Sequence, residues 1–150
     1  MRAVVNPGVA LVLRSPAHPL LSGSLLLLTV RGRKTGLLHQ LPVQFAREDG
    51  VLYVMPGRPR RKRWWRNLLG GAPVAVHLAG RRLTGTAEAF EGAKYPEAIR
   101  GGLEAYFRRF PAAARLHRVR RRADGTFDPA DLEHAAIDAV LVRIRPSQSI

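Results

Sequence analysis

The most pointed chemical feature of the sequence is a basic turn bounded by two glycines, Gly32-Arg33-Lys34-Thr35-Gly36. The glycines allow the main chain to turn with its N–H groups converging, while Arg33 and Lys34 add two cations and Thr35 adds a hydroxyl. This combination suits a phosphate or a carboxylate. It is not a Walker loop, because no G-x-x-x-x-G-K-[ST] pattern is present. An exposed hairpin tip is the structural alternative.

A second feature is the pair Trp64-Trp65, the only tryptophans, set in a basic segment with Arg60, Arg61, Lys62, Arg63 and Arg66. Consecutive helical residues point about 100° apart, so we expect one indole in the core. The other would then lie near the basic surface, where it can stack on a flat ring. Packing of both indoles in the core is the alternative.

The residues that several other kinds of chemistry require are missing from the sequence. The chain has no Cys, which excludes disulfides, thiolate nucleophiles and Cys-based metal centres. Its five His show no HxxxH or HxH spacing and no carboxylate cluster joins them, so no metal site is predicted. The sequence also lacks the G-x-S-x-G elbow of hydrolases and a G-x-G-x-x-G dinucleotide motif.

The chain length of 150 residues and the 46% content of hydrophobic residues predict one domain over 1–150 with a single sizeable core. Uninterrupted apolar runs such as Leu25–Leu28 fall far short of the roughly 18 residues that a membrane span needs. Asn6 and Pro7 interrupt the apolar N-terminal stretch, which makes it a poor secretory signal. We therefore expect a cytoplasmic protein.

The formal net charge of +14 is concentrated in two segments. Val30–Gly70 holds eight Arg and two Lys against two acidic residues, and Arg100–Arg122 holds eight Arg against one acidic residue. Such clusters favour an anionic partner over a merely solvated face. The charge alone leaves open whether that partner is nucleic acid, a membrane surface or a small polyanion.

Hydrophobic patterning predicts six strands, at Leu25–Gly32, Leu38–Arg47, Val51–Met55, Pro73–Gly80, Arg81–Phe90 and Ile137–Ile144. Asp49-Gly50 and Gly80 are typical of hairpin turns. Two helices are expected, one carrying the Trp pair and one opened by Tyr95-Pro96 and ended by Pro111. Residues 1–23 are expected to form an N-terminal helical extension, and the segment before Ile137 a loop. Hairpins of this kind predict a small, mainly β barrel with flanking helices.

The basic turn, the following strand, the "MPG" loop and the "RWWRNLLGGAPVAV" segment together resemble the deazaflavin-dependent nitroreductase family. The resemblance runs from about Leu25 to Phe90 and continues weakly through "YFRRFP" to the last strand. It implies a six-stranded antiparallel split β-barrel of the FMN-binding type. It also implies an oxidoreductase that uses coenzyme F-420, an 8-hydroxy-5-deazaflavin, with FMN as the alternative cofactor.

The resemblance further implies a set of cofactor contacts on this chain. Arg33, Lys34 and Thr35 match the turn that holds the phosphate and acidic tail. The strand that lines the deazaflavin is matched by His39, Gln40, Leu41, Pro42, Val43 and Gln44. The loop over the ring system is matched by Met55, Pro56, Gly57 and Arg58, and the helix start that closes the site by Trp64, Trp65 and Asn67. The net charge of Val30–Gly70 agrees with a phosphate-plus-glutamate tail.

The match departs from nitroreductase-active members at Ala113, where those relatives place a Tyr near the substrate. Ala113 cannot donate a proton, so activity on nitro compounds does not follow from the resemblance. His117 is the candidate donor that remains, because it would lie one helical turn beyond Ala113.

The leading hypothesis is therefore a reductase that transfers hydride from the reduced deazaflavin to a small apolar acceptor: a quinone, a nitro compound or an activated alkene. One alternative is a non-catalytic module that sequesters the deazaflavin or a lipid-like ligand. Another is an Arg-rich nucleic-acid-binding domain, although no nucleic acid is expected as partner under the leading hypothesis. A peripheral contact with a membrane surface and a homodimer stay open.

Overall fold

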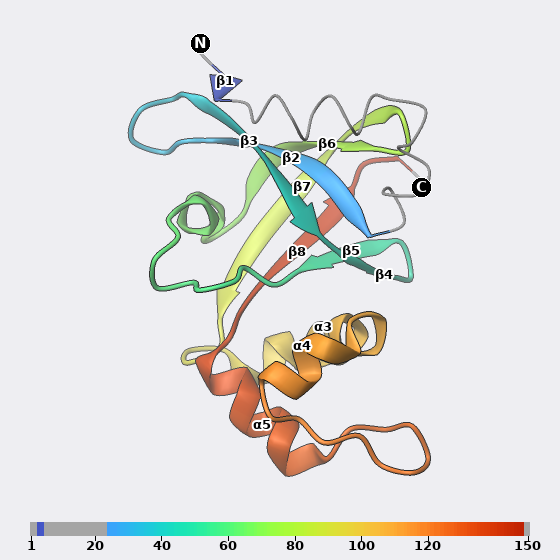
Figure 1. The fold of residues 1–150 in the computed structure, drawn as a ribbon. Helices are drawn as coiled ribbons and strands as arrows, with labels where there is room; N and C mark the ends of the chain where they lie inside the picture. Colours follow the sequence, from blue (N-terminus) through green and yellow to red (C-terminus); the bar gives the residue numbers. More distant parts are fainter. Residues whose placement is uncertain (1–2, 5–23, 149–150) are drawn as a thin grey trace.

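A computed structural model describes residues 3–4 and 24–148 (Figure 1). The helical extension expected over residues 1–23 lies outside the described residues, except for Ala3–Val4, which form the short strand β1. The other strands are β2 (Leu25–Arg31), β3 (Leu38–Gln44), β4 (Ala46–Glu48), β5 (Val51–Val54), β6 (Ala72–Leu78), β7 (Arg81–Glu91) and β8 (Val140–Pro146).

All described strands belong to one sheet in the order β1-β3-β2-β6-β7-β8-β5-β4. Every neighbouring pair is antiparallel except β1 and β3. The hairpins β2–β3, β4–β5 and β6–β7 confirm the sequence patterns. The expected number of six strands was wrong. The segment predicted as one strand over Leu38–Arg47 breaks at Phe45 into β3 and β4, and β1 is additional.

The break at Phe45 explains how the sheet curls into an open barrel. Only Phe45 separates β3 from β4, yet β4 ends the sheet order while β3 lies next to its other end, beside the two-residue strand β1. The main chain itself therefore brings the two edges together. The Phe45 N–H donates to the Ser24 carbonyl (3.0 Å) at the point where the strand changes its partner from β2 to β5. The described strands β3 and β5 diverge there without pairing.

The helices gather at one end of the sheet (Figure 1). They are α3 (Pro96–Arg109), α4 (Pro111–Leu116) and α5 (Pro129–Asp138), and a 3₁₀-helix, η1 (Trp64–Leu68), carries the Trp pair. The prediction of only two helices was wrong. Pro111 does not merely end α3 but starts α4, and the predicted loop before the last strand contains α5. No helix within the described part of the chain is long and apolar enough to cross a membrane.

Two hydrophobic cores result from this arrangement. One fills the barrel, and the other lies between the helices and the outer face of the sheet. Strand β8 serves both, because Val140, Val142 and Ile144 face the barrel while Leu141 faces the helices. The start predicted for this strand at Ile137 was wrong, since Ile137 and Asp138 end α5.

Helix α3 lies unusually close to the sheet at Gly102. A Cβ atom at that position would come within 2.5 Å of the Tyr53 ring and 2.6 Å of the Leu141 Cδ2 atom. The apolar stripe predicted for this helix is confirmed, with Ile99, Leu103 and Phe107 fully buried. Helix α3 thus stands between the barrel on one side and α4 and α5 on the other.

Candidate functional site

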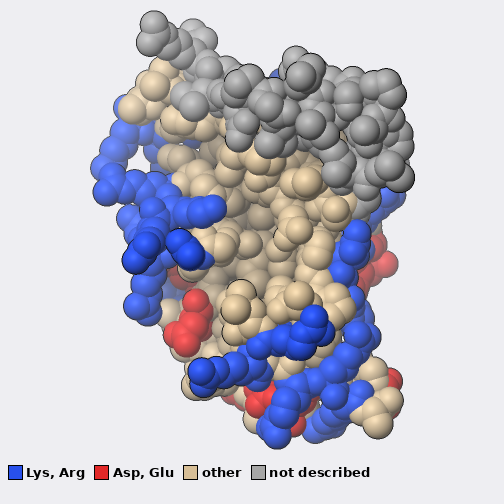
Figure 2. Space-filling view, viewed as in Figure 1, with Lys and Arg blue, Asp and Glu red and all other residues tan. Residues whose placement is uncertain are grey.

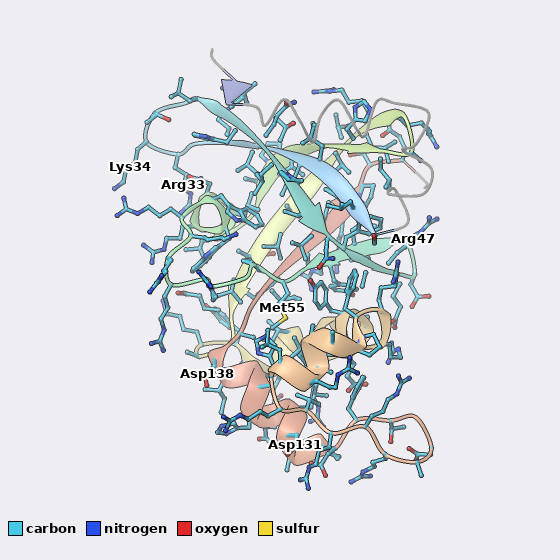
Figure 3. All side chains as sticks on the ribbon, viewed as in Figure 1. Arg33, Lys34, Arg47, Met55, Asp131 and Asp138 are labelled. Carbon is cyan, nitrogen blue, oxygen red and sulfur yellow. The ribbon has the colours of Figure 1, made fainter. Side chains whose placement is uncertain are left out.

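A cleft of about 180 Å³ opens where β3 and β5 diverge. Residues from five parts of the chain line it: Leu41, Pro42, Val43 and Gln44 from β3, Val54, Met55, Pro56 and Gly57 from β5 and the loop after it, Lys62, Trp64, and Tyr106 from α3. Figure 3 places Met55 between the sheet and the helices. The split in the barrel therefore provides a cleft with aliphatic and aromatic side chains, exposed polar groups and one cation, Lys62, in its walls.

Half of the sixteen residues assigned to cofactor binding line this cleft. They are Leu41, Pro42, Val43, Gln44, Met55, Pro56, Gly57 and Trp64. The other eight lie elsewhere: Arg33, Lys34 and Thr35 in the basic turn, His39 and Gln40 further along β3, Arg58 in the next loop, and Trp65 and Asn67 in η1. Three lining residues, Val54, Lys62 and Tyr106, were not foreseen.

The basic turn has a compact main-chain geometry. The Gly32 N–H donates to the Leu37 carbonyl (2.8 Å), and Gly36 adopts a φ of +72°. A Cβ atom on Gly32 would approach the Thr35 hydroxyl oxygen to 2.8 Å, and that oxygen accepts from the Leu37 N–H (3.2 Å). Both glycines are therefore needed, the first for a close approach and the second for a left-handed conformation.

Asn67 connects the basic turn to the Trp pair. Its Oδ1 atom accepts from the Arg33 main-chain N–H (2.9 Å), and its Nδ2 group donates to the Trp64 carbonyl (3.1 Å). The Arg33 guanidinium donates to the Leu69 carbonyl, so it fastens the turn to the end of η1. Lys34 is exposed. Arg33 and Asn67 thus position the turn against the cleft wall, and Lys34 remains the exposed cation at its tip.

The two indoles have different environments, as the helical spacing predicted. Trp65 is only 3% exposed and belongs to the barrel core. Its Nε1 group donates to the Pro59 carbonyl (2.9 Å), which holds the loop before η1 in place. Trp64 is half-buried and lines the cleft. Trp65 therefore stabilises the loop and η1 from within the barrel core, while Trp64 forms part of the cleft surface.

His39, Gln40 and Arg58 do not face the cleft. The His39 imidazole lies beside Gly32, and the Gln40 amide donates to the Thr29 hydroxyl on β2 (3.1 Å). Arg58 has a left-handed φ of +51° and lies in a separate depression with Arg60 and Asp138. The resemblance located their segments, but the hydrogen-bond partners and the neighbouring strand decide where each side chain lies.

Tyr106 contributes a buried hydroxyl to the cleft. Its side chain is 6% exposed, and its ring packs on Phe110 at a centroid distance of 4.8 Å. Within residues 3–4 and 24–148 the hydroxyl has no hydrogen-bond partner. Burial raises the pKa of Tyr106 above its ordinary value, so the phenol keeps its proton at neutral pH. An unpaired buried hydroxyl is unfavourable, and its place in a cleft indicates a partner on a ligand.

His117 and Ala113 do not line the cleft. The His117 ring packs on Phe107 at a centroid distance of 5.7 Å, on the helical side of α3. Burial lowers the pKa of His117, which keeps the imidazole neutral. Ala113 packs in the core beneath the helices. Among the described residues no group of three His, Asp or Glu could hold a metal ion.

The charge distribution distinguishes two basic regions (Figure 2). On the face shown, Lys and Arg lie along the left margin, down part of the right margin and around the helical end, and the centre between them is uncharged. Figure 3 places Arg33 and Lys34 on the left margin, away from the helices. A cleft with aromatic and aliphatic side chains in its walls, flanked by cations, suits a ligand with a flat ring and an anionic part.

A curled antiparallel sheet with such a cleft at its split has the architecture of a split β-barrel. Residues 13–107 match the model of the F420H(2)-dependent quinone reductase family, and the chain belongs to that family. It is therefore an oxidoreductase, and its cofactor is coenzyme F420. The resemblance to deazaflavin-dependent enzymes noted in the sequence is confirmed.

Solved structures share the fold at low sequence identity. An F420-H2-dependent reductase, FDR-A, is 17% identical, with 81% of this chain and 94% of that chain covered and a TM-score of 0.56. A structure described as a domain-swapped dimer is 15% identical, with 93% and 100% covered and a TM-score of 0.54. The heme storage protein HutZ from Vibrio cholerae is 16% identical, with 99% and 93% covered and a TM-score of 0.50. No match was found among curated proteins.

Proposed function

We propose that this protein transfers reducing equivalents from reduced coenzyme F420 to a small apolar acceptor, in the first place a quinone, in the cleft between β3 and β5. When bound, the cofactor supplies a hydride. The observation that carries the proposal is the cleft itself, which combines an indole, a proline and a methionine in otherwise largely polar walls, a neighbouring basic turn and an unpaired buried hydroxyl. The family description names quinones as the acceptor class of its members.

The residues of the cleft fit the two parts of the cofactor. Pro42, Met55 and Trp64 offer the flat and polarisable surfaces that suit a tricyclic ring. Sites that enclose a whole drug-sized ligand measure roughly 300–1,000 Å³. The cleft, at about 180 Å³, would enclose only part of such a molecule. The anionic tail would then lie outside, toward Lys34 and Lys62, where charge-assisted contacts are available.

Binding and turnover can be tested separately with the purified protein. Fluorescence anisotropy of the oxidised deazaflavin should rise on adding the protein, and FMN at the same concentration should bind more weakly. Rapid mixing of protein, reduced cofactor and a water-soluble quinone should give cofactor oxidation that depends on the protein. Tighter binding of FMN would contradict the cofactor assignment, and binding without turnover would favour the sequestering module. Nitro compounds and activated alkenes, used in place of the quinone, define the acceptor class.

Tyr106 is the group that would provide the proton in this scheme. Reduction of a quinone to a hydroquinone takes one hydride and one proton, and the oxidised cofactor leaves. The Tyr106 hydroxyl has a proton to give at neutral pH and no described partner that competes for it. It would regain a proton from solvent after each turnover. Tyr106 on α3 would thus donate the proton that Ala113 cannot donate, and His117 would not be required.

Replacing Tyr106 with Phe tests this role. A positioned proton donor contributes about 10²–10⁴-fold to turnover, so kcat should fall by that range while cofactor affinity is kept. Removing an unpaired buried hydroxyl should also raise the Tm. Tyr53→Phe is the matched control, because Tyr53 packs beneath the helices and not in the cleft. An unchanged kcat in Tyr106→Phe would remove the hydroxyl from the reaction.

A further inference from the structure

A second and larger cavity, an open groove of about 590 Å³, lies on the helical side of the molecule. We call it the α4 groove. Its floor is apolar and consists mainly of Ala114, Val119 and Phe127, each at most 7% exposed. Its rim carries Arg115, Arg118, Arg120 and Arg121. All of these residues follow residue 107, where the family match ends.

The four arginines of the rim are not equivalent. Arg120 is paired with Asp131 (2.7 Å) and lies 3.8 Å from Asp128, so its charge is locally balanced. Arg121 donates to the Gly125 carbonyl (3.1 Å) and lies over the Phe127 ring at 5.5 Å.

Arg115 and Arg118 behave differently. Within the described residues their guanidinium groups have no hydrogen-bond or ion-pair partner. The groove therefore presents two uncommitted cations above an apolar floor.

The main-chain conformation at Arg118 is a second observation that points to a function for this side chain. Arg118 follows α4 with a left-handed φ of +59°, and the Val119 N–H closes the helix by donating to the Ala114 carbonyl (2.9 Å). Glycine is the residue usually found at this position, because any side chain makes the left-handed conformation unfavourable. Arg118 thus keeps its guanidinium at the groove at a cost in stability.

Leu116 adds an apolar group beside these cations. It ends α4 and is 80% exposed, the most exposed of the large hydrophobic side chains among the described residues. Figure 2 shows basic side chains around this helical end of the molecule. An aliphatic side chain next to free arginines is typical of segments that lie at a membrane surface.

We propose that the α4 groove binds an anionic phospholipid and thereby holds this protein at a membrane surface. Arg115 and Arg118 would contact the lipid phosphate, for which guanidinium groups are well suited. The floor would receive part of an acyl chain, and Leu116 would enter the interface. Nucleic acid fits less well, because Phe127 is buried beneath Arg121 and is not exposed for base stacking. The proposal uses no residue of the cofactor cleft, so it holds whatever the acceptor is.

Vesicle flotation tests the proposal with the full chain. The protein should float with vesicles of phosphatidylcholine plus phosphatidylglycerol and stay behind with phosphatidylcholine alone. Two charge-assisted contacts should make the double variant Arg115→Ala/Arg118→Gly about 10²-fold weaker in vesicle binding. The matched control is Arg81→Ala/Arg82→Ala, which removes the same charge from the exposed β6–β7 hairpin and should bind vesicles as the parent does.

Two single variants separate a built site from diffuse attraction. Arg118→Gly should weaken vesicle binding and raise the Tm, because glycine relieves the left-handed strain. Leu116→Ser keeps the charge and should weaken binding about tenfold. Equal losses in the two double variants, an unaffected Leu116→Ser, or displacement of the vesicles by inorganic phosphate would overturn the proposal. So would duplex DNA that binds tightly at physiological salt and depends on Arg115 and Arg118. Cofactor binding should be the same in all these variants.

Discussion

The cleft between β3 and β5 and the α4 groove are both flanked by cations, but these cations differ in the contacts that they already make. Beside the cleft, Arg33 is tied to main-chain carbonyl and amide partners and serves to position the turn. At the groove, Arg115 and Arg118 have no described partner, while their neighbour Arg120 is fully engaged by carboxylates. A run of Arg in a sequence therefore does not give the number of charges available to a ligand. The hydrogen bonds already made decide that number.

The comparison also separates the part of the chain that matches the family model from the part that follows it. The cleft is built almost entirely from the segment that matches the family model, whereas the groove lies beyond it. Helix α3 stands between the two, with Tyr106 in the cleft and Phe107 against Phe127 of the groove floor. Cofactor chemistry and surface attachment would thus occupy opposite sides of one helix.

The largest expected effect concerns the basic turn. Replacing Arg33 and Lys34 with Ala removes the free cation at its tip, Lys34, and the tie between Arg33 and Leu69 that positions the turn. The loss of one charge-assisted contact implies a fall of about 10–10²-fold in cofactor affinity, and displacement of the turn should add to it. The loss is measured by titrating the oxidised deazaflavin with protein and following its fluorescence anisotropy at low and at high salt. The affinity of the parent protein for the cofactor should fall as the salt concentration rises. Arg115→Ala/Arg118→Gly removes equal charge and should leave cofactor affinity unchanged. If both double variants weaken the cofactor equally, the attraction is diffuse and the two regions are not distinct.

A smaller effect is expected at the helix that both regions share. Gly102→Ala places a Cβ against Tyr53 and Leu141, so α3 must move and unfolding should become easier by about 1–3 kcal/mol. Gly101→Ala is the matched control. A Cβ there meets nothing within 4 Å, so the change should stabilise the helix by about 0.5–1 kcal/mol. Chemical denaturation measures both. Equal effects at the two positions would mean that α3 does not pack closely against Tyr53 and Leu141 at Gly102.

The smallest effect concerns pH. Burial lowers the pKa of His117, so in the folded state the imidazole stays neutral at pH values where the unfolded chain takes up a proton. Stability should therefore fall as pH drops below about 6.5. His117→Gln should reduce this loss, measured by urea unfolding on either side of that pH. Turnover should be unchanged in His117→Gln. A loss of turnover would mean that His117, on the helical side of α3, takes part in proton transfer.

The sequence predicted the strands well and the helical end poorly. Alternating residues and glycine turns identify hairpins because they depend on local geometry. Pro111 was interpreted as a stop, but proline also suits the first turn of a helix, and α4 begins with it. The start of α5 was visible in principle, since Asp128 caps the Asp131 N–H (3.0 Å) and Pro129 follows it.

The candidate site was predictable only where residues lie in one continuous motif. Residues 41–44 and 55–57 were located by resemblance, and each group forms one wall of the cleft. Tyr106 was assigned to the apolar stripe of its helix, because periodicity identifies a buried face but does not distinguish a core from a buried cleft. The α4 groove depends on how α4 packs against residues 118–127, and no local pattern encodes that contact.

The split that forms the cleft also leaves strand β3 partly unpaired. Strand β1 covers β3 only at Leu38 and His39, so within the described residues the stretch 40–44 has a strand neighbour on one side alone. An open strand edge of this kind invites another strand to add to it, from a peptide or from a second molecule. Pro42 stands in the middle of the stretch and has no N–H to donate, which blunts that tendency. A ligand seated in the cleft would cover the same edge. Loading with cofactor is thus expected to protect this protein from self-association through its sheet.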